Sequence, residues 1–435
     1  MTILEIVVLS APLAIVLLSL AFMPLIAPKF WQKNEGSVFI IVSAISIVSL
    51  YGLLPEANHI LKDALIDDYL PFIIMLFTLY VLSHGIHIKL KSASDTMSNV
   101  IFLACCSLFS SFIGTTGASM LFLRPFLEMN KDRHHKSHLI IFFIFLVSNI
   151  GGLLTPLGDP PLLLGYLHGI DFSWELKNIF IYWLGYLVVC LFALYVIDRI
   201  ILKKENLEHH LVNRKFSIEI GDWLNVVLII STVFVLFFDF KDFGLHIPYL
   251  CDCVVPHMCI KNTILVIFCL ISIYKGRNAG EKVDFAPFGE VARTFFVIFI
   301  VIAPVLFILN SNSDMIHKYI LDMSNGSDGS MIYFWLCSLA SSFLDNAPSY
   351  LLFFNMAGGN PQELMYVYTD VLRAISISSV VMGAMTYIGN APNMMVKSIA
   401  IKRGIKMPSF IGYMLWSSAI ILPVSFVMSW ILAKW

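Results

Sequence analysis

Charged residues are scarce in this chain, and none of the usual marks of a soluble protein compensates for them. Only 13% of the 435 residues are charged and 58% are hydrophobic, against about 25% and about 45–50% in an average soluble protein. The net charge of −1 leaves no surplus for a nucleic-acid partner. This composition excludes an ordinary soluble domain and predicts that the lipid bilayer is the main solvent.

Clusters of residues that could carry catalysis or hold a cofactor are also missing. The eight cysteines are scattered, several of them inside apolar segments, so no disulfide framework is implied. One loop gathers Cys251, Cys253, His257 and Cys259, but the spacing matches no standard zinc pattern, and a metal there is a minor alternative. No nucleophile with a base lies within an apolar segment. The sequence therefore predicts no enzyme and no cofactor.

What the chain has in abundance is apolar segments long enough to cross a bilayer, which takes about 20 residues in a helix. Two segments, 96–128 and 331–357, are interrupted in the middle by small or turn-forming residues and predict re-entrant hairpins. The remaining segments predict about ten crossings and an all-α polytopic membrane protein. They cover residues 3–26, 37–54, 69–88, 138–168, 174–202, 223–239, 260–274, 290–310, 366–400 and 408–433.

The placement of charge agrees with this topology. Short cytoplasmic loops are enriched in Lys and Arg, and with the N-terminus outside, the predicted inner loops carry them while the outer loops carry acids such as Asp171 and Glu175. If 96–128 crossed as one helix, Lys89 and Lys131 would lie on opposite sides, whereas a hairpin keeps both inside. We expect a multi-pass protein of a bacterial inner membrane.

An internal repeat is the sharpest signal in the sequence. Residues 106–112 (CSLFSSF) and 337–343 (CSLASSF) agree at six of seven positions, at an offset of 231. The repeat predicts two halves, 1–215 and 216–435, each with five crossings, so that the second half is inverted. Inverted repeats are typical of secondary transporters, although a duplicated scaffold without transport remains an alternative. The same offset also pairs Gly152 with Gly383, Thr155 with Thr386, Gly158 with Gly389 and Pro161 with Pro392.

Each half contains a helix that proline and glycine interrupt. Pro156, Pro160 and Pro161 in the first half, and Pro392 in the second, leave backbone carbonyls without a helical donor. Such backbone is tolerated at membrane depth only where protein or a wet cavity surrounds it. The freed carbonyls, with the hydroxyls of Thr155 and Thr386, are hard oxygen ligands that suit a sodium ion.

The hairpin tips are the predicted partners of the two breaks. They consist of 114–117 in the first half and 345–348 in the second, and helix N-termini after such breaks present N–H groups and a positive dipole end. A module of this kind can hold an ion of either sign. The candidate substrate contacts around it are Asn149, Thr115, Thr116, Ser342 and Asn393.

Two acids favour a cation. Asp159 and Asp345 lie in membrane segments, where an ionised carboxylate costs roughly 2.5–3.5 kcal/mol or more unless it is paired. With Asn390 as a possible further oxygen ligand, they form the candidate site at which a sodium ion and a proton compete, which is an antiport mechanism. The alternatives are that Asp159 only caps the following half-helix, that Asp345 forms a turn, and that Asn390 satisfies loose backbone.

Long basic side chains near the breaks leave a further question open. Arg124 and Lys397 lie about two turns from them, where such side chains usually reach out to the membrane interface. Either could instead be the counter-ion of an acid in the site. A Lys or Arg paired with Asp159 or Asp345 would favour an anionic substrate over a cation.

Three stretches resemble the ion transporter superfamily, in particular NhaD-type sodium:proton antiporters and their citrate-transporter-like relatives. They are SNIGGLLTPLGDPPLLLG (148–165), SSFLDNAPS (341–349) and TYIGNAP (386–392). The resemblance implies two discontinuous helices, elevator-like or rocking movement, a homodimer, and Asp159, Asp345, Asn346 and Asn390 as site residues. The first hairpin tip departs from the acidic pattern of the second, because Gly114, Thr115 and Thr116 stand where the second has Asp345, Asn346 and Ala347.

Two functions follow from these observations. The leading hypothesis is sodium:proton antiport, with a small inorganic cation as the partner. The alternative is sodium- or proton-coupled transport of a small organic anion such as citrate. The fold common to both is an inverted-repeat secondary transporter.

Overall fold

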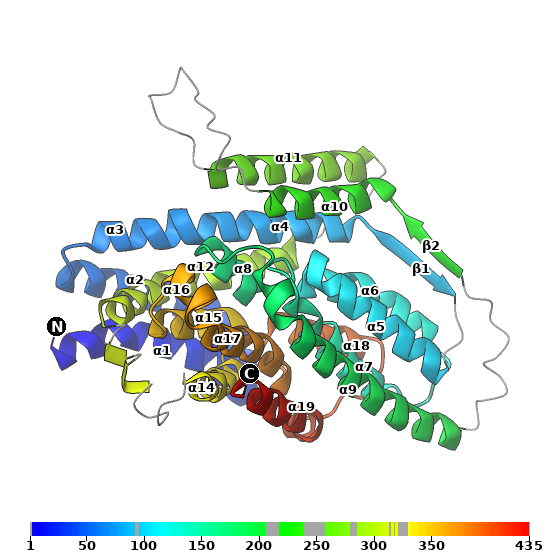
Figure 1. The fold of residues 1–435 in the computed structure, drawn as a ribbon. Helices are drawn as coiled ribbons and strands as arrows, with labels where there is room; N and C mark the ends of the chain where they lie inside the picture. The colour runs from blue at the N-terminus through cyan, green and yellow to red at the C-terminus, as the bar shows by residue number, and fades with distance from the viewer. Residues whose placement is uncertain are drawn as a thin grey trace.

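The computed structural model describes residues 2–91, 95–205, 217–238, 257–278, 285–312, 315–316, 318–320 and 329–434, and within them the protein is a bundle of helices (Figure 1). Eight of the described helical segments are long and apolar enough to cross a membrane, and shorter apolar helices accompany them. The all-α polytopic fold is therefore confirmed. The sequence did not predict one short antiparallel strand pair, β1 (His87–Lys91) and β2 (Ser217–Gly221), which connects the end of α4 to the start of α10.

The first half begins with three membrane-crossing rods. They are α1 (Ile3–Ile26), α2 (Pro28–Leu53), and a third rod in which α3 (Ala57–Lys62) continues through the π-helix η1 (Asp63–Tyr69) into α4 (Leu70–His84). A helical hairpin, an interrupted helix and one long helix follow. They are α5 (Thr96–Ile113) and α6 (Thr115–Met129), then α7 (Ser137–Leu146), η2 (Ile150–Leu153) and α8 (Pro160–Leu167), and finally α9 (Trp174–Glu205).

Within the described residues the second half repeats this order, and a short helix, α16 (Pro361–Tyr366), follows its hairpin. Its three rods are α10 (Trp223–Phe237), α11 (His257–Asn278) and α12 (Ala286–Ser311). The hairpin is α14 (Ser330–Phe343) and α15 (Asn346–Met356), the interrupted helix is α17 (Thr369–Val381), η3 (Met382–Met385) and α18 (Ala391–Lys402), and the last helix is α19 (Phe410–Leu432). Both predicted hairpins and both predicted discontinuous helices are present.

The two halves exchange packing partners. Helices α1 and α2 pack against α12 of the second half, and α10 and α11 lie along α4 of the first (Figure 1). The second arm of each hairpin also contacts the half-helix of the other repeat, α6 with α18 and α15 with α8. Two inverted repeats would produce this reciprocal exchange. The division into 1–215 and 216–435 stays a prediction.

The distribution of polar and apolar side chains is that of a membrane protein. Large apolar side chains stand on the outside of the bundle, among them Ile40 (72% exposed), Phe234 (70%) and Leu415 (68%). Polar side chains are instead buried where the hairpins and breaks meet. Lipid in contact with the outer surface accounts for the first feature, and hydrogen bonding inside the bundle for the second.

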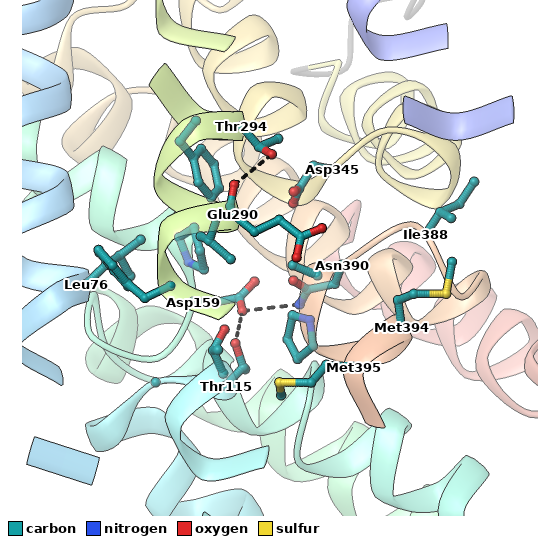
Figure 2. A pocket seen from close by; sticks show the side chains of 18 of the residues that line it. Leu76, Thr115, Asp159, Glu290, Thr294, Asp345, Ile388, Asn390, Met394 and Met395 are labelled. Atoms are coloured by element: carbon teal, nitrogen blue, oxygen red, sulfur yellow. Dashed lines mark hydrogen bonds between the residues drawn. The ribbon is translucent and has the colours of Figure 1, made fainter. Parts of the chain in front are cut away.

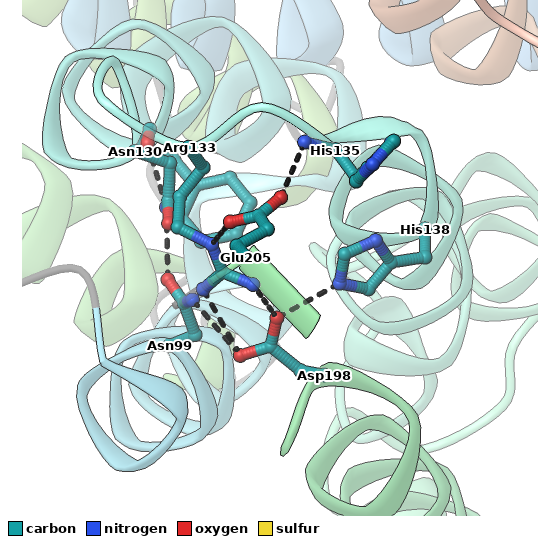
Figure 3. A network of polar contacts seen from close by, with 8 residues as sticks. Asn99, Asn130, Arg133, His135, His138, Asp198 and Glu205 are labelled. Carbon is teal, nitrogen blue, oxygen red and sulfur yellow. Dashed lines mark hydrogen bonds and ion pairs between the residues drawn. The ribbon is translucent and has the colours of Figure 1, made fainter. Parts of the chain in front are cut away.

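A buried ionic network fastens α9 to the loop between α6 and α7 (Figure 3). Arg133, only 2% exposed, donates to Asp198 at 2.6 Å and to Glu205 at 2.9 Å. His138 lies 2.8 Å from the same Asp198 oxygen, and Asn99 donates to the other at 3.4 Å. Arg133 lies in the predicted inner loop that also contains Lys131, and nothing in the local sequence distinguishes it from an exposed charge. Its burial ties the end of the first hairpin, α7 and α9 into one unit.

Candidate functional site

The two broken helices touch each other inside the bundle. The side-chain amide of Asn390 donates to the carbonyl of Ser148 at 3.0 Å and to the side-chain oxygen of Asn149 at 3.2 Å. Asn149 in turn donates to the side chain of Asn393 at 2.8 Å. The two breaks belong to different halves of the sequence, and these amides join them directly.

In each half, a threonine hydroxyl in the broken helix forms a hydrogen bond to the hairpin of the same half. Thr155 donates to the carbonyl of Ser111, and Thr386 donates to the carbonyl of Ser342 at 2.6 Å. The amide two residues later donates back to each hydroxyl, at 3.2 and 3.3 Å. The two arrangements match at the offset of the sequence repeat. In this conformation both hydroxyls are engaged with the backbone.

The carboxylate of Asp159 is the point on which four segments converge. It is 2% exposed and accepts from Thr115 at 2.5 Å, from Asn346 at 2.7 Å and from Asn390 at 3.3 Å. Figure 2 shows Asp159 between Thr115 and Asn390. The donors come from the first hairpin tip, the second hairpin tip and the second break. All of them are neutral.

Asp159 and its three donors occupy two pairs of positions that are equivalent in the sequence repeat. The repeat offset relates Thr115 to Asn346, and it also relates Asp159 to Asn390. Each half thus contributes one residue from a hairpin tip and one from the residue that precedes a half-helix. Only the first half supplies an acid at the break, so the site is structurally symmetric and electrostatically asymmetric.

Glycines allow the breaks to pack this closely. A Cβ on Gly158 would lie 2.1 Å from the carbonyl oxygen of Gly152, and one on Gly383 would lie 2.1 Å from the side-chain oxygen of Asn346. At the first hairpin tip, Gly114 has a φ of +80°, a conformation that L side chains rarely adopt. A side chain at Gly158 or Gly383 would therefore collide with atoms that already occupy that space.

A cavity of about 580 Å³ adjoins Asp159 (Figure 2). Its wall includes Thr115, Thr116, Asp345 and Asn390 of the predicted site. Asp345 is half-buried and stands at the tip of the second hairpin. The cavity therefore brings the two acids of the predicted site to one space, although no hydrogen bond joins them.

The cavity continues away from Asp159 toward the starts of α2 and α12, at the predicted inner face. Glu35 and Glu290 line it there, and Glu35 pairs with Arg293 at 3.5 Å. Among the described residues that line the cavity, four are acidic and none is Lys, Arg or His. The cavity thus extends toward the predicted inside, with an acidic wall.

Four helices begin at the same cavity, namely α6, α8, α15 and α18. The residues that open them, including Thr116, Pro160 and Ala391, are part of its wall. Helix N-termini present N–H groups and the positive end of the helix dipole. The cavity therefore combines carboxylates, which attract cations, with helix ends, which attract anions.

Other predicted site residues lie behind this wall. Asn149, Asn393 and Ser342 do not line the cavity, and Asn393 donates to the backbone of Gly383 at 2.8 Å and of Thr386 at 3.0 Å. Their contacts hold the breaks in shape. Whether any of them binds substrate stays a prediction.

Two of the alternatives left open by the sequence, a cap at Asp159 and a basic counter-ion, can be compared with the geometry. The side chain of Asp159 makes no capping hydrogen bond to α8. Lys397 stands 4.0 Å over the ring of Tyr387, and Arg124 is exposed. Within the described ranges, no Lys, Arg or His forms an ion pair with either acid. The ion pair that would have favoured an anionic substrate is therefore not seen among these residues.

Half of the cysteine-rich cluster predicted as a minor alternative metal site lies outside the described residues. Cys251 and Cys253 lie outside the described residues. Among the residues that are described, no group of three or more His, Cys, Asp or Glu side chains is placed to hold a metal ion.

Sequence reasoning missed Glu35 and Glu290 as parts of the cavity wall. Both stand near the ends of apolar spans, where an acid ordinarily faces solvent, and no local pattern distinguishes them. It also missed Ser341, which donates to the side-chain oxygen of Asn346 at 2.9 Å and so orients its amide toward Asp159. The repeat at 337–343 contained that serine, but its spacing did not reveal its partner.

Comparison with known proteins gives one finding. A family model described as "Putative citrate transport" matches residues 3–433, nearly the whole chain. No curated protein matches the sequence. The match supports the citrate-transporter-like side of the resemblance, and the NhaD-type side is not confirmed.

Proposed function

The chain belongs to the citrate-transport family whose model spans residues 3–433, and from that premise we propose that it is a cation-coupled secondary transporter of a small carboxylate of the citrate kind. The observation that carries the proposal is the Asp159 carboxylate, buried among neutral donors beside a cavity at which four helices begin. The proposed location is a bacterial inner membrane, and a homodimer is part of the proposal.

The coupling cation is assigned to Asp159 because of its surroundings. Its three hydrogen-bond donors are neutral, so they stabilise the carboxylate without cancelling its charge. A buried, unneutralised charge inside a membrane is costly. A sodium ion or a proton at Asp159 removes that cost, and Asp345 on the same cavity is the second candidate ligand.

The size of the cavity supports a substrate larger than an ion. About 580 Å³ falls in the range of about 300–1,000 Å³ typical of small-molecule sites. The helix N-termini offer N–H groups to carboxylates. The acidic wall, however, repels a free polyanion. We therefore propose that the cation binds first and that the carboxylate follows.

Sodium:proton antiport is the second candidate, and the composition of the cavity wall favours it. Four acids and no basic side chain among its described residues suit cations alone. In that mechanism Asp159 and Asp345 bind sodium and protons in turn, and the helix ends have no anionic ligand. The two candidates share the cation site and differ in whether a carboxylate moves.

Proteoliposomes distinguish them. The purified protein is reconstituted with a trapped pH dye, and uptake of labelled citrate is measured with and without a sodium gradient. Sodium- or proton-driven citrate uptake that is lost in Asp159→Asn supports the first proposal. Sodium-evoked proton movement without citrate uptake supports antiport instead. Activity of either kind that survives both Asp159→Asn and Asp345→Asn contradicts the assigned site. Asp171→Asn, an exposed acid between α8 and α9, is the matched control.

A further inference from the structure

A second group of buried polar atoms lies away from the cavity. Glu175, in the first turn of α9, is 1% exposed, and neither carboxylate oxygen has a hydrogen-bond partner in the described part of the chain. The hydroxyls of Tyr350 on α15 and Ser376 on α17 are likewise buried; they lie close to each other, and neither makes a well-aligned hydrogen bond within the described part of the chain. We call these three residues the Glu175 cluster. Buried polar groups are ordinarily satisfied, so each exception requires a physical reason.

The Glu175 cluster lies where four helices pack together. Helix α15 packs against α8 and α17, and α17 packs against α9. The hydroxyl of Tyr350 lies close against α8 at Gly165. A Cβ added to Gly165 would lie 2.3 Å from this hydroxyl. The Glu175 carboxylate acts electrostatically on Tyr350. The cluster is thus enclosed by elements of both halves.

The charges around Glu175 do not neutralise it. Asp171, an exposed acid just before α9, adds repulsion. Arg373 on α17 is the basic group of the neighbouring helix, and it donates to Asp370 at 2.7 Å and to Asn178 at 3.0 Å. No ion pair joins it to Glu175 among the described residues. An ionised Glu175 would therefore be a buried charge with neither a counter-ion nor a donor side chain, which is strongly unfavourable.

We propose that Glu175 is a second cation-binding site of this protein, separate from the Asp159 site, and that its occupant in this conformation is a proton. A proton requires one oxygen atom, whereas a sodium ion requires a shell of them. Neither hydroxyl of the Glu175 cluster hydrogen-bonds the carboxylate, so these oxygens do not form such a shell. The proton converts the buried charge into a neutral carboxylic acid.

This site is linked to the cavity through a single turn of helix. Tyr350 follows Asn346 by four residues on α15, which places the two on the same face of the helix, one turn apart. Loss of the proton would require water to reach Glu175, and therefore separation of α9 from α17, which also packs against α15. Protonation of Glu175 thus favours the packed arrangement in which Asn346 donates to Asp159.

Infrared spectroscopy of the purified protein in lipid nanodiscs tests the proposal without any transport measurement, so it stands apart from the substrate assignment. Wild type and Glu175→Gln are compared at neutral pH, with Asp171→Asn as the control. The expected result is that the difference spectrum for Glu175→Gln loses a carboxylic-acid C=O stretching band that Asp171→Asn retains. Gln has the size and neutrality of the protonated side chain, so the variant should fold.

Three outcomes overturn the proposal. In the first, Glu175→Gln loses only ionised-carboxylate bands, which would show that Glu175 is charged. In the second, Glu175→Gln fails to fold while Glu175→Asp folds, because a neutral residue should replace a neutral acid. In the third, sodium chloride, but not choline chloride, abolishes the acid band at constant pH, which would make sodium the occupant.

Discussion

The side-chain amide of Asn346 donates to the carboxylate of Asp159 at 2.7 Å, across 187 residues of sequence. This bond joins the tip of the second hairpin to the first broken helix. The other two donors, Thr115 and Asn390, complete a ring in which each half of the protein supplies two residues. A movement that separates a hairpin from the break of the other half must therefore change the hydrogen-bond partners of Asp159. Ion binding at Asp159 and the conformation of the protein are coupled in this way.

The first prediction concerns the charge of Asp159. Asp159→Asn keeps the size of the side chain and removes its charge, so sodium binding should weaken on the order of 100-fold, the equivalent of losing about 2–3 kcal/mol of charged interaction. Isothermal titration of the purified protein with sodium chloride measures this. The melting temperature should fall as well, because the new side chain accepts only at its one oxygen and loses part of the hydrogen bonding from Thr115, Asn346 and Asn390. Unchanged sodium affinity would remove Asp159 from the cation site.

The second prediction concerns the donor across the repeat. Asn346→Ala leaves one buried oxygen of Asp159 without its partner, at an expected cost of about 1.5–3 kcal/mol for a bond to a charged group. Thermal unfolding in detergent should show the loss, and added sodium should restore part of it. Asn355→Ala is the control, because Asn355 is also buried on α15 but donates only to the backbone of Leu351 at 2.8 Å. Equal effects of the two variants would contradict a special role for Asn346.

The sequence predicted the parts of the site better than their connections. Proline and glycine located both breaks, because these residues disrupt helices wherever they occur. The repeat offset related Thr155 to Thr386, and the structure gives both the same kind of backbone partner in their own halves. The contact between Asn346 and Asp159 was not predictable in this way. It depends on how the two halves dock, which no local pattern encodes.

The same limit explains what was missed. Glu35 and Glu290 join the cavity only because α2 and α12 from different halves lie beside it. Arg133 looked like an ordinary inner-loop charge, and its burial depends on Asp198, 65 residues later. Local sequence rules give element type and interruption, whereas the identity of long-range partners comes from the packed fold.

The third prediction tests the equivalence of the two breaks. Thr155→Val and Thr386→Val each remove a hydroxyl that joins a break to its hairpin, so each should lower the free energy of unfolding by about 0.5–1.5 kcal/mol. Denaturation with matched protein samples measures both. If the halves are true structural repeats, the two losses should agree within about 0.5 kcal/mol, since each hydroxyl donates to a hairpin carbonyl of its own half and accepts from the amide two residues later. A large loss at only one position would argue against equivalent breaks.

The fourth prediction concerns the close approach of backbone at the second break. Gly383→Ala would place a Cβ 2.1 Å from the side-chain oxygen of Asn346, so that side chain must move away from Asp159. We expect a loss of about 1–3 kcal/mol in stability from overpacking, together with weaker sodium binding. Gly276→Ala is the control, because a Cβ there meets no atom within 4 Å. Wild-type sodium affinity in Gly383→Ala would show that the position of Asn346 does not matter to the cation.

The last prediction separates the anchoring network from the transport site. Arg133→Ala leaves Asp198 buried without its charged partner, and breaking a buried pair in this way costs about 3–5 kcal/mol. A double variant, Arg133→Met with Asp198→Leu, removes one of the two ion pairs and should recover only part of that loss, because Glu205 then stays buried without its arginine. Lys131→Ala, which breaks an exposed pair with Glu128, should change stability by less than about 1 kcal/mol. Thermal unfolding ranks the three variants. The network holds the first hairpin, α7 and α9 together without lining the cavity. The double variant should therefore bind sodium with wild-type affinity. Weaker sodium binding in the double variant would mean that the network also positions Asp159.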